Sequence, residues 1–106
     1  MRKIKQIPKK ISILDSEVKV KLKDDLVSGG DKLGLANLDF DKIEIQKPGK
    51  TFPLKDSTVI RVFWHEVTHM ILHKLSYHDL CVDEDFVERF SSVLNQVTKD
   101  MIYLEK

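Results

Sequence analysis

Hydrophobic and polar residues alternate along the first half of the chain. The alternation runs through Ile11 and Ile13 and then through Val18, Val20 and Leu22. A period of two residues is the pattern of strands that bury one face. Asp15 and Ser16 supply turn residues between the two runs, so residues 10–23 are predicted to form a hairpin. Residues 33–38 and 42–46 are predicted to form a second strand pair that turns at residues 39–41.

The second half changes to helical spacing. From residue 57 to 75 the apolar positions recur at i, i+3, i+4, i+7 and i+11, with Asp56 or Ser57 as the expected N-cap. These positions are Ile60, Phe63, Trp64, Val67 and Ile71. Residues 76–82 are expected to connect to a second helix, which Asp83 can cap. Its predicted packing face is Phe86, Val87, Phe90, Val93, Leu94, Val97 and Met101.

These patterns predict a single α+β domain over residues 1–106. A small antiparallel sheet in the N-terminal half is expected to pack on two helices, with residues 1–9 as a basic tail. The 106 residues suit one domain with one hydrophobic core.

Composition narrows the function classes. The chain has 18 Lys and Arg against 17 Asp and Glu, and this near balance argues against a dedicated nucleic-acid-binding protein. The single cysteine, Cys81, excludes an internal disulfide framework. The basic start is not followed by the apolar stretch of a signal peptide, and no apolar run approaches the ~20 residues of a membrane span. We therefore expect a cytoplasmic protein without a membrane partner.

All four histidines lie between His65 and His78. The first two belong to a five-residue H-E-x-x-H motif. The motif is His65, Glu66, Val67, Thr68 and His69. Residues four apart on a helix point the same way, so both histidines can bind one Zn²⁺. Glu66 is rotated by about 100° from His65 and falls beside the metal, where it can act as general base. The motif therefore predicts a zinc-dependent hydrolase.

A catalytic zinc site needs a third protein ligand. His73 is two turns from His65, about 12 Å along the axis, so a supporting role is expected for it. Acidic residues of the second helix are better placed, and Glu84 is favoured over Glu88 as the ligand. Glu88 is then available to hydrogen-bond the free nitrogen of a ligating histidine. The choice between these two glutamates stays open, and stabilisation of the helix N-terminus is the alternative role for the acids around Asp83.

The motif helix followed by residues 84–94 resembles small gluzincin-type zinc metallopeptidases, in particular the ImmA/IrrE-like group and its short phage-encoded relatives. The resemblance implies a minimal zincin-like fold that combines a strand hairpin, an edge strand, the motif helix and a second helix with an acidic ligand. The four-residue spacing of Glu84 and Glu88 matches the ligand and the supporting carboxylate of that class. Thr68 stands where many relatives carry glycine, and the second helix lacks their Glu-Ala-Asn run.

Weaker signals suggest further roles near the motif. Tyr77 and His78 are candidates to stabilise an oxyanion by their position after the helix. The strand at residues 43–46 is a candidate to pair with an extended peptide substrate. Cys81 is interpreted as a small buried filler, with zinc coordination as the alternative.

The favoured hypothesis is a zinc metallopeptidase that acts on peptide or protein substrates. Its ligands would be His65, His69 and Glu84, with Glu66 as the catalytic residue. The alternative is a catalytically silent, zinc-stabilised protein-interaction or regulatory module, such as a phage-encoded one, which a fourth ligand from Cys81 or His78 would favour. A third hypothesis is a metal-free, DNA-associated protein that uses its basic end.

Overall fold

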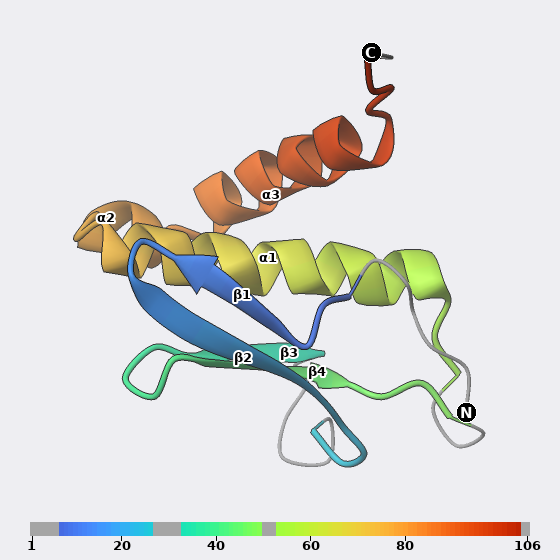
Figure 1. The fold of residues 1–106 in the computed structure, drawn as a ribbon. Helices are drawn as coiled ribbons and strands as arrows, with labels where there is room; N and C mark the ends of the chain where they lie inside the picture. Colours follow the sequence, from blue (N-terminus) through green and yellow to red (C-terminus); the bar gives the residue numbers. More distant parts are fainter. Residues whose placement is uncertain (1–6, 27–32, 50–52, 105–106) are drawn as a thin grey trace.

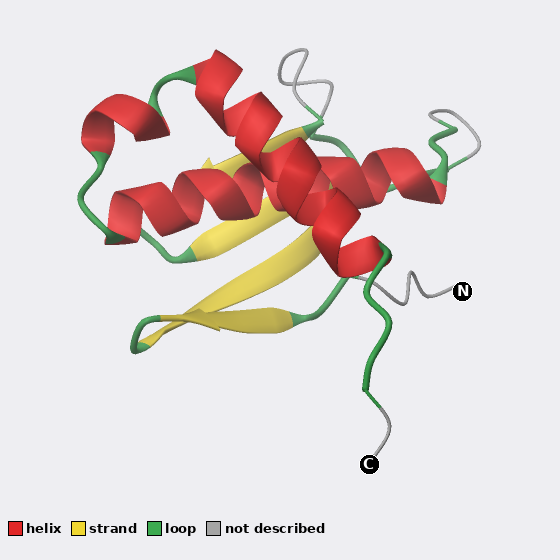
Figure 2. Cartoon of the chain, turned by 90° about the horizontal axis from the view of Figure 1, so that it is seen from above, coloured by secondary structure: helices red, strands yellow, loops and turns green. Residues whose placement is uncertain are grey.

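Four strands and three helices form three layers in the computed structural model, which describes residues 7–26, 33–49 and 53–104 (Figure 1). The strands are β1 (Lys10–Ile13), β2 (Ser16–Lys23), β3 (Gly34–Asn37) and β4 (Lys42–Gln46). The helices are α1 (Asp56–Lys74), α2 (His78–Cys81) and α3 (Glu84–Lys99). Helix α1 lies between the sheet and α3, and α3 crosses α1 at an angle (Figure 2). The α+β prediction is confirmed, and the expected connector contains the short helix α2.

The sheet is mixed, with strand order β1-β2-β4-β3. Both predicted hairpins form, since β1 pairs antiparallel with β2 and β3 pairs antiparallel with β4. The central pair β2 and β4 is parallel, with Val20 opposite Ile43, so the expectation of a fully antiparallel sheet is wrong for this pair. Alternation could not reveal this, because a period of two residues is the same in both strand directions.

The main core lies between the sheet and α1. Val18, Val20, Ile43 and Ile45 of the central strands pack with apolar side chains of the helix. The buried helix residues of this cluster are Val59, Val62, Phe63, Val67 and Met70. The expected helix face is therefore displaced, because Ile60, Trp64 and Ile71 are only partly buried. Trp64 and Ile71 pack at the margin of this core.

The two long helices begin differently. Lys55 occupies the N-cap position of α1, and among the described residues no side chain caps it, so the expectation of Asp56 or Ser57 as the cap is wrong. Asp56 instead lies in the first turn, where a negative charge favours the helix dipole. Asp83 caps α3 as predicted, because its Oδ1 accepts a hydrogen bond from the backbone N–H of Phe86 at 3.1 Å.

Helix α3 buries only part of the apolar face that its periodicity suggested, since Val87 is buried and Phe86 and Leu94 are partly buried. Val87 and Ser91 are buried, whereas Phe90 is 49% exposed, Val93 59% and Val97 51%. Met101 lies beyond the end of the helix and is also exposed. The helix is turned so that Glu84 and Glu88 reach side chains of α1. Within the described part of the chain, no helix has both the length and the apolar character that crossing a membrane requires.

Candidate metal centre

His65 and His69 lie one turn apart on α1 and direct their Nε2 atoms toward one carboxylate. Glu84 Oε2 is 3.1 Å from His65 Nε2, and Glu84 Oε1 is 3.0 Å from His69 Nε2. One ligand atom from each of the three residues lies within 4.8 Å of the others. The structure thus brings together the three residues predicted as ligands, from two helices that are joined through α2.

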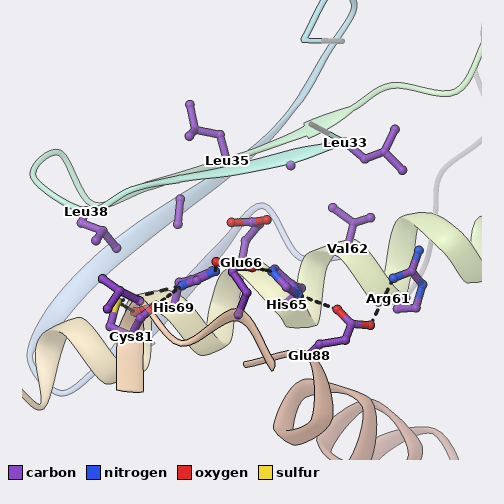
Figure 3. Close-up of a pocket in the computed structure, with 14 residues that line it drawn as sticks. Leu33, Leu35, Leu38, Arg61, Val62, His65, Glu66, His69, Cys81 and Glu88 are labelled. Atoms are coloured by element: carbon purple, nitrogen blue, oxygen red, sulfur yellow. Dashed lines mark hydrogen bonds and ion pairs between the residues drawn. The ribbon is translucent and has the colours of Figure 1, made fainter. Parts of the chain in front are cut away.

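The remaining ring nitrogens have partners on the opposite side of each histidine (Figure 3). His65 Nδ1 is 2.8 Å from Glu88 Oε2, and His69 Nδ1 is 2.7 Å from the backbone carbonyl of Cys81. Carboxylate and carbonyl oxygens only accept, so each Nδ1 carries the proton and donates it. Each Nε2 atom likewise faces an oxygen of Glu84, so a proton on Nε2 or a cation in its place would lie between the nitrogen and the oxygen.

This arrangement fits a bound cation. Two imidazole nitrogens face two carboxylate oxygens at 3.0 and 3.1 Å, a position that either a proton or a metal ion can occupy. Two imidazole nitrogens and one carboxylate form the donor set of three-ligand zinc sites. Hydrogen bonds from the other ring nitrogens to a carboxylate and a carbonyl are the usual support of such ligands. The donor chemistry therefore suits zinc.

Glu66 lies beside this group and is 8% exposed. Burial raises the pKa of its carboxyl group, and the negative charge of Glu84 adds to the increase. Positive charge on His65 or His69 and a hydrogen bond from the backbone N–H of Ala36 act in the opposite direction. Glu66 is thus a buried carboxylate beside the three candidate ligands, as the motif predicted.

Strand β3 runs along the open edge of the sheet above Glu66. The backbone N–H of Gln46 donates to the Leu33 carbonyl at 2.8 Å, so the backbone of Leu33 points toward β4. Along an antiparallel pair every second residue points the same way, so Leu35 and Asn37 also bond to β4. The backbone groups of Gly34 and Ala36 consequently point toward the open edge. The predicted peptide-binding strand at residues 43–46 is wrong in this respect, because β4 is paired on both sides. Strand β3 holds the edge position beside the site.

A pocket of about 550 Å³ contains the candidate ligands (Figure 3). Apolar side chains form much of its wall, and β3, α1 and the segment around Cys81 all contribute. The lining residues are Leu33, Gly34, Leu35, Ala36, Leu38, Arg61, Val62, His65, Glu66, His69, Cys81, Val82, Glu84 and Glu88.

Three predicted supporting residues lie elsewhere. Tyr77, His78 and His73 are absent from the described residues that line this pocket, so the proposed oxyanion role of Tyr77 and His78 lacks the required position. Tyr77 is 56% exposed. The His73 ring packs edge-on against His78, with 5.8 Å between centroids. The short helix α2 carries this end of the connector away from the ligands.

Cys81 contributes its backbone rather than its thiol. Its Sγ lies 3.3 Å from the His69 carbonyl, to which it donates, while its own carbonyl accepts from His69 Nδ1. Burial raises the pKa of the thiol, and the nearby charge of Glu84 raises it further. The interpretation of Cys81 as a small buried side chain is confirmed, since it is 5% exposed.

Two residues at the site escaped the sequence reasoning. A Cβ atom built on Gly34 would lie 2.5 Å from Val62 Cγ1 and 2.9 Å from Glu66 Cγ, so only glycine allows this approach of β3 to α1. Arg61 lines the pocket and contacts Glu88. Its position one turn before His65 was the available signal, because residues four apart share a helix face.

A scan against protein-family models found no match, and searches of curated proteins and of solved structures found none either.

Proposed function

We propose that this chain is a zinc-dependent metallopeptidase with His65, His69 and Glu84 as metal ligands. The observation that carries the proposal is the convergence of two Nε2 atoms on one carboxylate, at 3.1 and 3.0 Å. Both Nδ1 atoms have hydrogen-bond partners on the other side, so in the neutral imidazoles Nε2 is the atom that can bind a cation. Three protein ligands beside an open pocket are typical of a catalytic zinc site rather than a structural one.

Glu66 is the proposed general base and then general acid. When bound, zinc supplies a Lewis acid that polarises a carbonyl group and lowers the pKa of water to about 7. Glu66 takes a proton from the attacking water and delivers it to the leaving amine as the C–N bond of the peptide breaks. The hydrogen bond from Ala36 N–H holds its carboxylate at the ligands.

The substrate is proposed to be an extended peptide bound along β3. The Gly34 backbone groups and the Ala36 carbonyl point toward the open edge, where a peptide strand can pair with them. The apolar wall beside them, which includes Leu33, Leu38 and Val82, suits uncharged substrate side chains.

The silent zinc-stabilised module receives less support. Cys81 and His78 were the residues expected to close such a site with a fourth ligand. Among the described residues the candidate group contains only the two motif histidines and Glu84. The cytoplasmic location and the peptide partner remain predictions.

Metal content tests the ligand assignment. Protein purified with zinc is expected to hold one equivalent, and His65→Ala or His69→Ala should lose it. His73→Ala is the matched control, because His73 is on the same helix but outside the candidate group, and it should retain zinc. The assignment would be contradicted if the wild type stayed metal-free after zinc addition, or if only the His73 variant lost its zinc.

Hydrolysis of a peptide library tests the catalytic step. Glu66→Gln should keep the fold and the zinc but lose activity by at least about 100-fold, the scale of general-base catalysis. Asp85→Asn removes an exposed acid from the first turn of α3 and should retain activity. Stoichiometric zinc without hydrolysis of any peptide by the wild type would favour the silent module instead.

A further inference from the structure

Arg61 joins the candidate metal centre through a chain of two interactions. Its Nη1 donates to Glu88 Oε1 at 3.3 Å, and Glu88 Oε2 is 2.8 Å from His65 Nδ1. Each oxygen of the carboxylate therefore has its own partner, the guanidinium on one side and the imidazole on the other (Figure 3). Both partners lie on α1, whereas Glu88 reaches them from α3.

The two histidines differ in how their orientation is maintained. His69 Nδ1 donates to the backbone carbonyl of Cys81, which the chain itself holds in place. His65 Nδ1 depends on the side chain of Glu88, which is 45% exposed and has rotatable bonds of its own. Arg61 gives this carboxylate a second contact, at Oε1, which restricts the rotamers open to it.

We propose that Arg61 is a positioning residue that orients His65 through Glu88. The guanidinium keeps its charge and fixes one carboxylate oxygen, so the other oxygen stays at His65 Nδ1. This holds the ring in the tautomer whose Nε2 lone pair faces Glu84. The inference rests on the proposed zinc site and adds a determinant of metal affinity that does not touch the metal.

Zinc affinity, measured by competition with a chelator, gives the first test. Removing a group that orients a ligand costs about 10–100-fold in affinity, and we expect Glu88→Gln to fall in this range and Arg61→Met at its lower end. Arg61→Lys should recover part of the loss, since it retains the charge without the planar donors. Arg89→Met is the matched control, because Arg89 forms a similar pair with Asp85, at 3.2 Å, on the exposed side of α3.

The double variant Arg61→Met with Glu88→Gln tests the route of the effect. If Arg61 acts through Glu88, the arginine substitution should add little once Glu88 has been changed. Nitrogen NMR of the imidazole rings gives a second readout in metal-free and zinc-loaded protein. The Nδ1–H signal of His65 should broaden or disappear in Arg61→Met, while that of His69 remains.

The outcomes separate this inference from the proposed function. If the wild type binds no zinc, the zinc site fails, and the His65 signal in metal-free protein still tests the role of Arg61. If the wild type binds zinc and Arg61→Met binds it as tightly as Arg89→Met does, the inference is wrong. Additive losses in the double variant, or an unchanged His65 signal, would also overturn it.

Discussion

Gly34 shows how a single residue without a side chain shapes the site. It lies on the edge strand where β3 comes closest to Glu66 and Val62 of α1. The contact is too tight for a Cβ atom, so the separation between β3, the proposed substrate-binding edge, and Glu66, the proposed general base, depends on this glycine. Sequence patterns did not single it out, because the constraint comes from a helix that begins more than twenty residues later.

Gly34→Ala is therefore expected to push β3 or Glu66 out of place. Overpacking of this kind costs about 1–3 kcal/mol of unfolding free energy, and hydrolysis should fall more than zinc content does. Gly49→Ala is the control, because a Cβ built there meets nothing within 4 Å, and its change should stay within about 0.5 kcal/mol. Urea denaturation and peptide hydrolysis of both variants provide the comparison. Equal effects of the two substitutions would argue against a tight contact at Gly34.

The buried carboxylate of Glu66 predicts a stability cost that depends on pH. Its pKa in the folded protein is raised above the ordinary glutamate value of 4.5, mainly by burial. The folded state thus holds this proton more tightly than the unfolded state does. The associated stability is present below pH 4.5 and is lost as pH rises through the folded pKa.

Glu66→Gln should remove this dependence, since glutamine is uncharged and its carbonyl can still accept from Ala36 N–H. In chelator, the variant is expected to be more stable than the wild type at pH 7, with a smaller difference at pH 4.5. Denaturation of both proteins at the two pH values measures this difference in unfolding free energy. A constant difference would mean that burial of the charge is not its source, and a less stable variant at pH 7 would reverse the predicted sign.

At the scale of elements, patterns within one segment predicted where the helices lie better than they predicted how the helices pack on each other. The two long helices and the Asp83 cap follow from spacing and from neighbouring residues within one turn. The rotation of α3 did not follow from them, because it depends on where α1 presents its histidines. With Glu84 and Glu88 turned toward these rings, the apolar stripe around Phe90 and Val93 faces outward.

The same rotation explains why the sequence left the choice of the predicted third ligand open. Glu84 and Glu88 are one turn apart on α3, so either could reach a histidine as far as spacing is concerned. In the structure Glu84 lies between the two Nε2 atoms and Glu88 at the outer Nδ1 of His65. Their different places are a property of how two helices cross, which periodicity along one helix does not contain.

Over the whole molecule, the candidate metal centre connects two packed units whose apolar cores differ in size. The sheet and α1 share the large apolar cluster, whereas α3 joins α1 through a smaller one that contains Leu72, Cys81 and Val87. Two proposed ligands come from α1 and one from α3. A bound zinc ion would therefore stabilise mainly the attachment of α3.

Removal of zinc by a chelator is expected to lower the melting temperature and to loosen α3 first. Hydrogen exchange should show faster exchange of α3 amides after chelation, with little change in β4 and in the middle of α1, because their core does not involve the metal. His65→Ala is the control, since chelator should not alter a protein that cannot hold the ion. A uniform increase across sheet and helices would mean that the metal supports the whole fold, and no change in α3 would mean that Glu84 does not link the helices through zinc.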